Sequence, residues 1–212
     1  MSPVADPTLE FERELHASGA TWVIGCDEVG RGAIAGPVAV GLGAVHLDCL
    51  DVPLGLRDSK MLSEKRREAV YPLATSWVSH HAVGYAEAHE VDRLGIVAAL
   101  GLAGKRALTA LHHAGVGIMQ SVVVLDGNHD YLSTHLATPP KITTRVKADR
   151  DCASVAAASV IAKVERDRLM IEADGTHPGY GWAGNKGYGS SAHYGALAEL
   201  GPSPLHRLTW LH

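Results

Sequence analysis

Residues 21–37 have the sequence TWVIGCDEVGRGAIAGP, in which an apolar run ends in two adjacent carboxylates, Asp27 and Glu28, before a glycine-rich turn. Like charges repel each other, and burial at the end of an apolar strand raises that cost further. A divalent cation offsets the cost, because Mg²⁺ and Mn²⁺ prefer hard oxygen ligands. An isolated Asp-Glu pair is more often a polar strand end at the surface, but the glycines on either side of Arg31 argue against that simpler interpretation.

The composition is typical of a globular protein. The 212 residues are 46% hydrophobic and 20% charged, and the net charge of -4 gives no overall basic signature of a nucleic-acid binder. Three cysteines without CxxC spacing and 13 histidines without an HExxH pattern predict neither a disulfide framework nor a zinc site. The sequence has no signal-peptide pattern and no apolar run of membrane-spanning length. We therefore expect a soluble, cytoplasmic protein that does not bind membranes.

The apolar patterns predict an α/β fold with a mixed sheet flanked by helices. Strands are expected over residues 21–28, 36–45, 77–85, 121–126 and 142–146. Helices are expected from Ser63, over 87–114 and over 152–174. The first three strands suit an antiparallel meander, and the fourth, wholly apolar run suits a central strand that is covered on both faces. The Gly-, His- and Pro-rich end of the chain, residues 176–212, is expected to form a small helical region on the main domain.

Carboxylates stand at the ends of predicted strands or just beyond them, in three places: Asp27 with Glu28, Asp126, and Asp149. Because sites in α/β sheets gather beyond the ends of central strands, these side chains are expected to converge. Neighbouring residues of a regular strand point to opposite faces, so Asp27 and Glu28 share a site only if the strand ends or twists there, which the glycines permit. Four convergent acids exceed what one cation needs and suit a two-metal site for phosphodiester hydrolysis.

Simpler interpretations exist for two of these acids. The run Asp126-Gly127-Asn128 is also a common turn sequence. Asp149 suits a surface position near the start of a helix, where its charge is favourable. Asp151 is the competing carboxylate, for which helix capping is the better interpretation. Spacing alone does not separate Asp149 from Asp151.

Six motifs in register resemble those of the ribonuclease HII family. In chain order they are Gly25-Cys-Asp-Glu-Val-Gly-Arg-Gly32, Asp58-Ser-Lys60-Met-Leu-Ser63, Leu125-Asp-Gly-Asn128, Val146-Lys-Ala-Asp149, Ala156-Ala-Ala-Ser-Val-Ile-Ala-Lys-Val-Glu-Arg-Asp167 and Asn185-Lys-Gly-Tyr-Gly189. The match covers about residues 21–210. Two departures are small: Glu165 stands where the family often has Thr, and His206-Arg-Leu-Thr-Trp210 matches the family's last segment only loosely.

The resemblance implies a ribonuclease H-like sheet followed by a small helical C-terminal region. It divides the chain into an N-terminal extension (1–20), a catalytic domain (21–175) and a C-terminal region that contributes to substrate binding (176–212). It also implies that Asp27, Glu28, Asp126 and Asp149 are catalytic ligands of two divalent cations, Mn²⁺ or Mg²⁺. Asp149 is thereby selected over Asp151.

The resemblance further implies how substrate is bound. The loop of Gly30, Arg31 and Gly32 would use its backbone to read the 2′-hydroxyl, the group that distinguishes RNA from DNA. Tyr188 would stack on the sugar of the following deoxynucleotide. The candidate phosphate contacts are Arg31, Lys60, Lys147 and Lys186.

The implied activity is that of an endoribonuclease acting on RNA–DNA hybrids and on duplex DNA containing ribonucleotides. Cleavage 5′ to the ribonucleotide would leave 3′-hydroxyl and 5′-phosphate ends. We expect a monomer with no obligate protein partner, no tail that carries a clamp-binding peptide and no N-terminal domain of the ribonuclease HIII type. Two alternatives remain: a ribonuclease HI-like enzyme that cuts only ribonucleotide runs, and an inactive hybrid-binding module.

Overall fold

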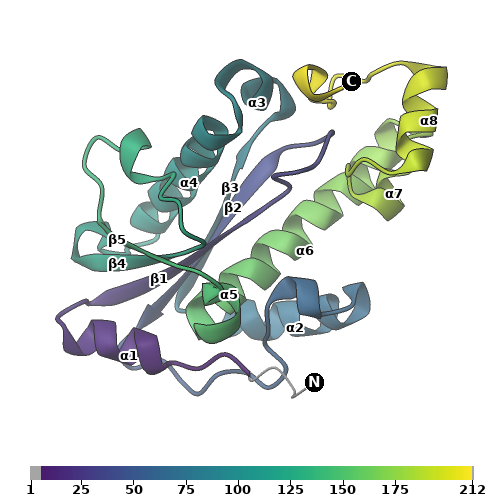
Figure 1. Ribbon diagram of the computed structural model, residues 1–212. Coiled ribbons are helices and arrows are strands. Elements are labelled where there is room, and N and C mark those ends of the chain that lie inside the picture. The colour runs from purple at the N-terminus through teal and green to yellow at the C-terminus, as the bar shows by residue number, and fades with distance from the viewer. Residues whose placement is uncertain (1–5, 212) are drawn as a thin grey trace.

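The computed structural model describes residues 6–211, within which five strands form one mixed sheet in the order β3-β2-β1-β4-β5 (Figure 1). The strands are β1 (Trp22–Val29), β2 (Val38–His46), β3 (His80–Ala86), β4 (Ser121–Asp126) and β5 (Lys141–Arg145). β1 pairs antiparallel with β2, and β2 pairs antiparallel with β3. β1 also pairs parallel with β4, which pairs parallel with β5. The predicted mixed sheet and its antiparallel meander are confirmed.

Helices cover both faces of this sheet. They are α1 (Glu10–Ala17), α2 (Glu64–Trp77), α3 (Ala88–Leu94), α4 (Ile96–His113), α5 (Ala148–Asp151), α6 (Ala153–Thr176), α7 (Trp182–Asn185) and α8 (Ser191–Leu200), with short 3-10 turns η1 (Ser59–Met61), η2 (Ile118–Gln120), η3 (Ser133–His135) and η4 (Leu208–Trp210). α4 packs on β2 and β3, whereas α6 crosses the opposite face against β1 and β2, with α2 packed on α6 (Figure 1). No helix within residues 6–211 is long and apolar enough to cross a membrane.

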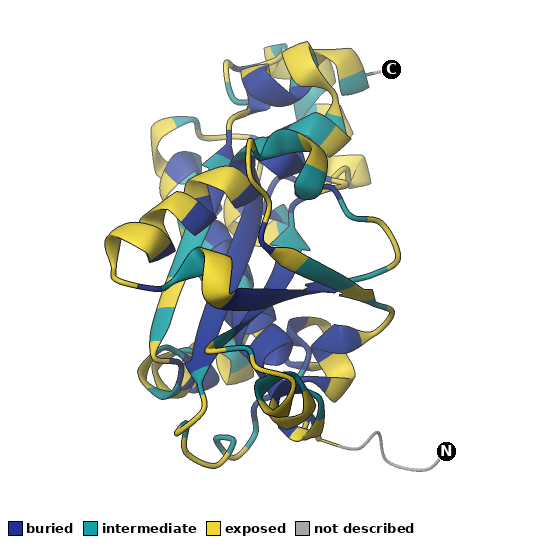
Figure 2. Cartoon of the chain, turned by 90° about the vertical axis from the view of Figure 1, so that its left-hand side faces the viewer, coloured by how far each residue is buried: buried dark blue, intermediate teal, exposed yellow. Residues whose placement is uncertain are grey.

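The sheet separates two apolar cores, and alternate residues of β1 serve one core each. Ile24 and Cys26 belong to the core on the α4 side, and Val23 belongs to the core on the α6 side. Figure 2 shows the buried residues concentrated in the strands, while the outward surfaces of the helices are exposed. Because β4 is covered on both faces, its residues 121–125 are all buried, as its continuous apolar run predicts.

Two predicted boundaries are wrong for local reasons. The helix expected over 87–114 is broken at Gly95, whose φ of 77° is outside the helical region, so that α3 and α4 are separate helices. The strand expected from Trp77 begins at His80, because α2 continues through Trp77 before the chain turns into β3. Neither shift changes the order of the elements.

The N-terminal segment packs against the start of α6. Cys152 has an extended backbone between α5 and α6, so the helix predicted over 152–174 begins one residue later, as α6, and Cys152 forms an isolated parallel bridge with Thr8. On α1, the buried carboxylate of Glu12 accepts hydrogen bonds through Oε1 from the backbone N and the Oγ of Ser154, at 2.8 and 2.7 Å. The described part of the predicted N-terminal extension therefore adds a layer beside α6.

The C-terminal region forms α7, α8 and η4 around the far end of α6 (Figure 1). Its small core contains Tyr180 and Trp182, whose rings stack with centroids 5.0 Å apart, together with Met170 of α6. The small helical region expected at the end of the chain is thus present, and it lies beside the glycine-rich turn that follows β1.

Candidate active site

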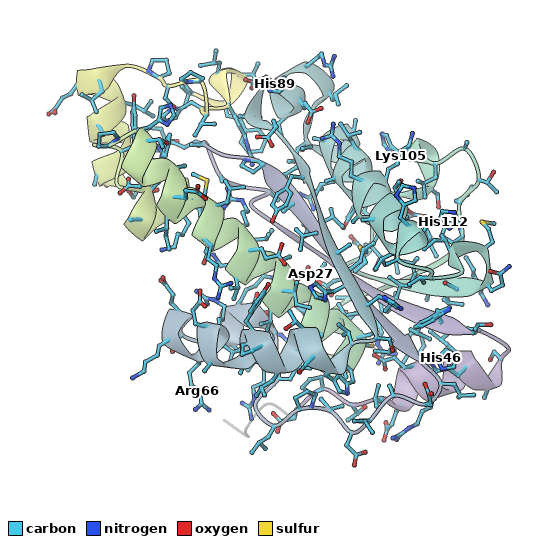
Figure 3. The ribbon with its side chains drawn as sticks, turned by 180° about the vertical axis from the view of Figure 1, so that it is seen from behind. Asp27, His46, Arg66, His89, Lys105 and His112 are labelled. Atoms are coloured by element: carbon cyan, nitrogen blue, oxygen red, sulfur yellow. The ribbon has the colours of Figure 1, made fainter. Side chains whose placement is uncertain are left out.

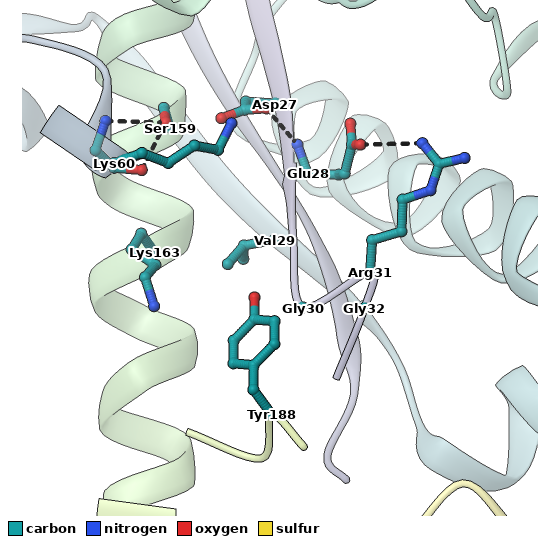
Figure 4. Close-up of a pocket in the computed structure, with 11 residues that line it drawn as sticks. Asp27, Glu28, Val29, Gly30, Arg31, Gly32, Lys60, Ser159, Lys163 and Tyr188 are labelled. Carbon is teal, nitrogen blue, oxygen red and sulfur yellow. Dashed lines mark hydrogen bonds and ion pairs between the residues drawn. The ribbon is translucent and has the colours of Figure 1, made fainter. Parts of the chain in front are cut away.

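A cavity of about 200 Å³ opens beside the end of β1 (Figure 4). The residues that line it are Asp27, Glu28, Val29, Gly30, Arg31, Gly32, Ser59, Lys60, Ser159, Lys163 and Tyr188. Seven of the eleven site residues predicted from the sequence are among them, and they come from β1, the following loop, η1 and the C-terminal region. Segments that are far apart in the sequence therefore meet at one cavity.

Asp27 and Glu28 lie on the two sides of β1 at this cavity. The strand does not end at Glu28 but continues through Val29. Asp27 points toward Lys60, while Glu28 points toward Arg31, whose Nη1 is 3.4 Å from Glu28 Oε1 (Figure 4). Because β4 pairs with β1 only as far as residue 26, both carboxylates lie beyond the end of the neighbouring strand.

Asp126 lies at the end of the adjoining strand β4, and Asp149 lies on the short helix α5, beyond the end of β5. Asp126 is the last residue of β4, and its Oδ1 accepts a hydrogen bond from the backbone N of Asp149 at 3.4 Å. Asp149 is only 4% exposed, and its Oδ2 is 3.3 Å from Lys60 Nζ. Asp151, the competing acid, has a side chain that is 53% exposed and pairs with Arg145.

Burial dominates the electrostatics of these acids. It raises the pKa of Asp27 to about 7, against the opposing charge of Lys60. Burial also raises the pKa of Glu28 and of Asp149, and the charge of Asp126 adds to both shifts. Asp27 is only 4% exposed, and Figure 3 shows it near the middle of the molecule. Burial works against the Lys60 ammonium as well, but the charges of Asp27 and Asp149 outweigh it and raise the pKa of that lysine.

The chemistry of this donor set fits divalent cations. The four carboxylates supply hard oxygen ligands only, and the burial of Asp27 is a cost that a bound cation offsets. Within residues 6–211, no three His, Cys, Asp or Glu side chains already form a metal-binding group. The acids are brought to one end of the sheet, with Lys60 as a counter-charge between Asp27 and Asp149.

The loop of Gly30, Arg31 and Gly32 is held from inside the protein by Arg207. This fully buried guanidinium donates from Nη2 to the Gly30 carbonyl at 2.7 Å and from Nη1 to the Arg31 carbonyl at 3.1 Å. Gly30 has a φ of 79°, and a Cβ at this position would overlap the side chain of Arg166. The loop thus turns its carbonyls inward, while Arg31 and Gly32 are exposed.

Tyr188 lies across the cavity from this loop. Its side chain is 36% exposed, and its backbone forms an isolated antiparallel bridge with Ala33, just after the loop. Lys163 Nζ is 5.9 Å from the Tyr188 ring centroid and Arg166 Cζ is 5.6 Å from it, so two cations border the ring.

Two predicted phosphate contacts lie outside the cavity lining. Lys147 is exposed and stands before α5 with a φ of 62°. Lys186 is only 6% exposed, and its ammonium is 3.5 Å from Glu64 Oε2 and also donates to the Ala183 carbonyl. A role for either lysine in binding phosphate stays a prediction.

Three polar residues that line the cavity, Ser59, Ser159 and Lys163, had no role assigned from the sequence. Ser159 Oγ donates to Ser59 Oγ at 2.9 Å, and Lys163 Nζ is 2.6 Å from Asp167 Oδ1. Residues 159, 163 and 167 recur every four positions, which places them on one face of α6. That spacing was the available signal, although it does not by itself distinguish a site from a helix face that packs on its neighbours.

The chain is similar to known proteins over nearly its whole length. The sequence model of the family described as Ribonuclease HII matches residues 24–212. The ribonuclease HII of Streptomyces avermitilis is 47% identical over 211 residues, which cover 99% of this chain and 86% of that protein. The solved ribonuclease HII of Archaeoglobus fulgidus, in a complex with PCNA, has a TM-score of 0.64 at 25% identity over 89% of this chain and 94% of that chain.

A second solved structure, Bst-RNase HIII in complex with Mn²⁺, shares the fold. Its TM-score is 0.68 at 23% identity, over 92% of this chain and 68% of that chain. The match of the family model and the identity of the curated relative both extend over nearly the whole chain. The chain therefore belongs to the ribonuclease HII family of metal-dependent ribonucleases, whose substrates are RNA–DNA hybrids.

Proposed function

We propose that this chain is an endoribonuclease that cuts the RNA strand of hybrids and also nicks duplex DNA 5′ to single embedded ribonucleotides. The observation that carries the proposal is the shared cavity, in which Asp27, the loop of Gly30 to Gly32 and Tyr188 face one another. A site that reads the sugar must have its recognition groups within one nucleotide of its catalytic groups. The common lining of this cavity meets that condition.

Recognition of the ribose is assigned to the loop. Because Arg207 donates hydrogen bonds to the carbonyls of Gly30 and Arg31, it ties the loop to the interior of the protein. A 2′-hydroxyl both donates and accepts hydrogen bonds, so fixed backbone groups can distinguish it from a 2′-hydrogen. Tyr188 is assigned to the sugar of the next nucleotide, where an aromatic ring stacks without reading the base. Together these contacts would select a ribose followed by a deoxyribose.

Catalysis is assigned to the four carboxylates. Asp27, Glu28, Asp126 and Asp149 would hold two divalent cations, Mn²⁺ or Mg²⁺. When bound, such ions lower the pKa of an attacking water and stabilise the leaving 3′-oxygen. The protein's part is to hold the acids at one sheet end and to exclude other ligands by burying Asp27 and Asp149. The products would carry a 3′-hydroxyl and a 5′-phosphate.

The basic residues at the rim are assigned to the phosphate backbone. Lys60 reaches Asp149 from η1, and the exposed guanidinium of Arg31 lies on the opposite side of the cavity. Such contacts position a duplex and carry no sequence information. The rate of nicking should therefore depend more on the salt concentration than on the bases that flank the ribonucleotide.

The test is a duplex that contains one ribonucleotide, compared with a hybrid that contains a run of them, each with Mg²⁺ and Mn²⁺ in separate assays. The proposal expects both substrates to be cut, with a 5′-phosphate on the ribonucleotide, and it expects Asp126→Asn to remove both activities while the variant still folds. Cleavage of the run alone would identify a ribonuclease HI-like specificity instead. Binding of the hybrid with no metal-dependent cutting would identify an inactive module.

We also propose that the chain works as a monomer and needs no protein partner. The relative from Archaeoglobus fulgidus forms a complex with PCNA. Every residue to which the proposal assigns a role belongs to this chain, and seven of these residues line one cavity. With no other protein added, the specific activity of the purified chain on the single-ribonucleotide duplex should stay constant across a range of enzyme concentrations. A specific activity that rises with concentration would contradict the monomer.

A further inference from the structure

Two buried histidines lie behind Tyr188 in the C-terminal region. His193 on α8 has no solvent exposure, and His206 is 2% exposed. Both belong to a cluster of packed rings with Tyr180 and Trp182. A buried polar side chain costs free energy unless its hydrogen bonds are made, and apolar residues would fill such a core without that cost. The role of these two histidines therefore depends on the groups to which they are hydrogen-bonded.

The partners of His206 determine which of its nitrogens carries the proton. The backbone N of Ser203 is 2.9 Å from His206 Nδ1, and a backbone N–H can only donate. Nδ1 is therefore the acceptor, and the proton of the neutral ring is on Nε2. Burial and the neighbouring His193 lower the pKa of His206 to about 4, so the ring is neutral at neutral pH. His206 Nε2 lies 3.0 Å from His193 Nε2, to which it donates.

The same reasoning applies to His193. The indole Nε1 of Trp182 is 3.1 Å from His193 Nε2, and an indole N–H can only donate. His193 Nε2 is thus an acceptor, and the proton is on Nδ1. That nitrogen is 3.0 Å from the carbonyl oxygen of Tyr188, to which it donates. The hydrogen bonds run in one direction, from Ser203 through the two rings to Tyr188.

The chain of hydrogen bonds ends on the residue whose ring faces the cavity. The backbone N–H of Tyr188 donates to the Asn185 carbonyl at 3.0 Å, and the preceding Gly187 carbonyl accepts from Ile34 and Ala35 at 2.9 and 3.0 Å. With its own carbonyl bound by His193, Tyr188 has a fixed backbone on both sides of its Cα. This fixes the direction of the Cα–Cβ bond, from which the ring extends toward the cavity (Figure 4).

We propose that His193 and His206 are positioning residues, which hold the Tyr188 carbonyl and so aim the Tyr188 ring at the sugar beside the cleaved bond. The proposal rests on the function proposed above, since it needs Tyr188 to contact substrate. It assigns a role in specificity to two residues that lie outside the cavity lining. Their loss should lower the cutting of single embedded ribonucleotides relative to ribonucleotide runs, because only the former presents a deoxyribose to Tyr188.

The experiment measures kcat/KM on both substrates and takes the ratio of the single-ribonucleotide value to the run value. Tyr188→Ala should lower this ratio about tenfold or more, the scale of a lost stacking contact. His193→Leu should lower the ratio in the same direction. In the double variant, His193→Leu should add nothing to Tyr188→Ala, since the histidine acts only through the tyrosine.

Two further variants separate positioning from general support of the fold. His193→Asn keeps a side-chain N–H near the position of Nδ1 and should restore the ratio toward that of the wild type. Leu197→Ala on the same helix removes apolar packing from the same cluster and should lower the melting temperature without changing the ratio. If His193→Leu fails to fold, His206→Leu and His206→Gln form the equivalent pair, with Gln keeping the donor to His193.

The outcomes distinguish this inference from the proposed function. If Tyr188→Ala leaves the ratio unchanged, the proposed contact of Tyr188 is wrong, and this inference fails with it. If Tyr188→Ala lowers the ratio but His193→Leu does not, only the positioning role is wrong. The positioning role is also wrong if the effects of the two substitutions on the ratio multiply in the double variant, because the two residues then act independently.

Discussion

Arg207 Nη2 lies 2.7 Å from the carbonyl oxygen of Gly30, 177 positions earlier in the chain. The same guanidinium binds the carbonyls of Arg31 and Gly36, and no carboxylate pairs with it among the described residues. Burial lowers the pKa of Arg207 to about 10, which leaves the side chain charged at neutral pH. All the hydrogen bonds of this buried charge go to backbone carbonyls of the turn after β1, so Arg207 holds that turn in shape.

Arg207→Lys should therefore weaken the enzyme more than a conservative change suggests. A single ammonium cannot reach three carbonyls in the geometry of the planar guanidinium. We expect kcat/KM on the single-ribonucleotide duplex to fall roughly tenfold to a hundredfold, the scale of a small misplacement of a binding group. Arg168→Lys is the matched control, because the Arg168 side chain is 50% exposed and pairs with Glu68 on the surface. Equal activity of both variants and the wild type would show that the loop does not need Arg207.

Gly30→Ala and Gly32→Ala form a second matched pair, two residues apart in the same loop. Gly30 has a φ of 79°, and an added Cβ would meet the Arg166 side chain, so we expect the free energy of unfolding to fall by about 1–3 kcal/mol. Gly32 has nothing within 4 Å of an added Cβ, so its variant should unfold like the wild type. Urea denaturation in EDTA measures both. A stable Gly30→Ala protein would mean that the loop can relax away from Arg166.

The fold could be predicted from the sequence where local patterns determine it. The mixed sheet follows from local patterns, because β1 and β4 are apolar runs whose alternate residues serve two cores. The break at Gly95 was missed because glycine is tolerated inside a helix, and only its φ of 77° separates α3 from α4. The boundaries of helices depend on single backbone angles, which the neighbouring elements impose.

The candidate site, too, could be predicted only in part. Asp27, Glu28 and Asp126 could be proposed because each follows an apolar run, whereas Asp149 was separated from Asp151 only by a resemblance. Arg207 could not be assigned to the loop, because its partners are 171 to 177 positions away and a lone arginine carries no local sign of burial. Lys163 was missed for a related reason, since one face of a helix predicts packing as readily as it predicts a cavity.

Glu12 should give the folded protein a measurable pH dependence. Burial raises the pKa of this carboxyl above its ordinary value of 4.5, and its Oε2 has no hydrogen-bond partner. A carboxyl whose pKa is raised by folding contributes stability at pH values below 4.5, and that contribution is lost as the pH rises through the folded value. Compared with Glu12→Gln, the wild type should therefore lose more stability between pH 4 and neutrality.

The measurement is urea denaturation of the two proteins across that pH range in EDTA. Other buried acids titrate in both proteins, so only the difference between the two curves reports Glu12. Glu14→Gln, on the exposed side of the same helix, should give a curve parallel to that of the wild type. Parallel curves for Glu12→Gln and the wild type would contradict the burial of an ionisable Glu12.

Asp149→Asn and Asp151→Asn test the assignment that spacing alone left open. Asp149 is buried beside Asp126 and Lys60, whereas the Asp151 side chain is 53% exposed and pairs with Arg145. Asp149→Asn should reduce nicking to a trace, because it removes a charged oxygen ligand, while Asp151→Asn should keep nearly the full rate. Gel analysis of the nicked duplex in Mn²⁺ measures both.

A second readout separates loss of the metal from loss of the chemistry. A cation that binds only the folded state raises the free energy of unfolding, by about 2.7 kcal/mol when it is present at 100 times its Kd. Titration with Mn²⁺ should therefore raise the melting temperature of the wild type and of Asp151→Asn, and should raise that of Asp149→Asn less. If Asp149→Asn is inactive but gains the full thermal shift, Asp149 acts on the substrate and is not a ligand of the ion. If Asp151→Asn is the variant that loses both readouts, the two acids have been assigned the wrong way round.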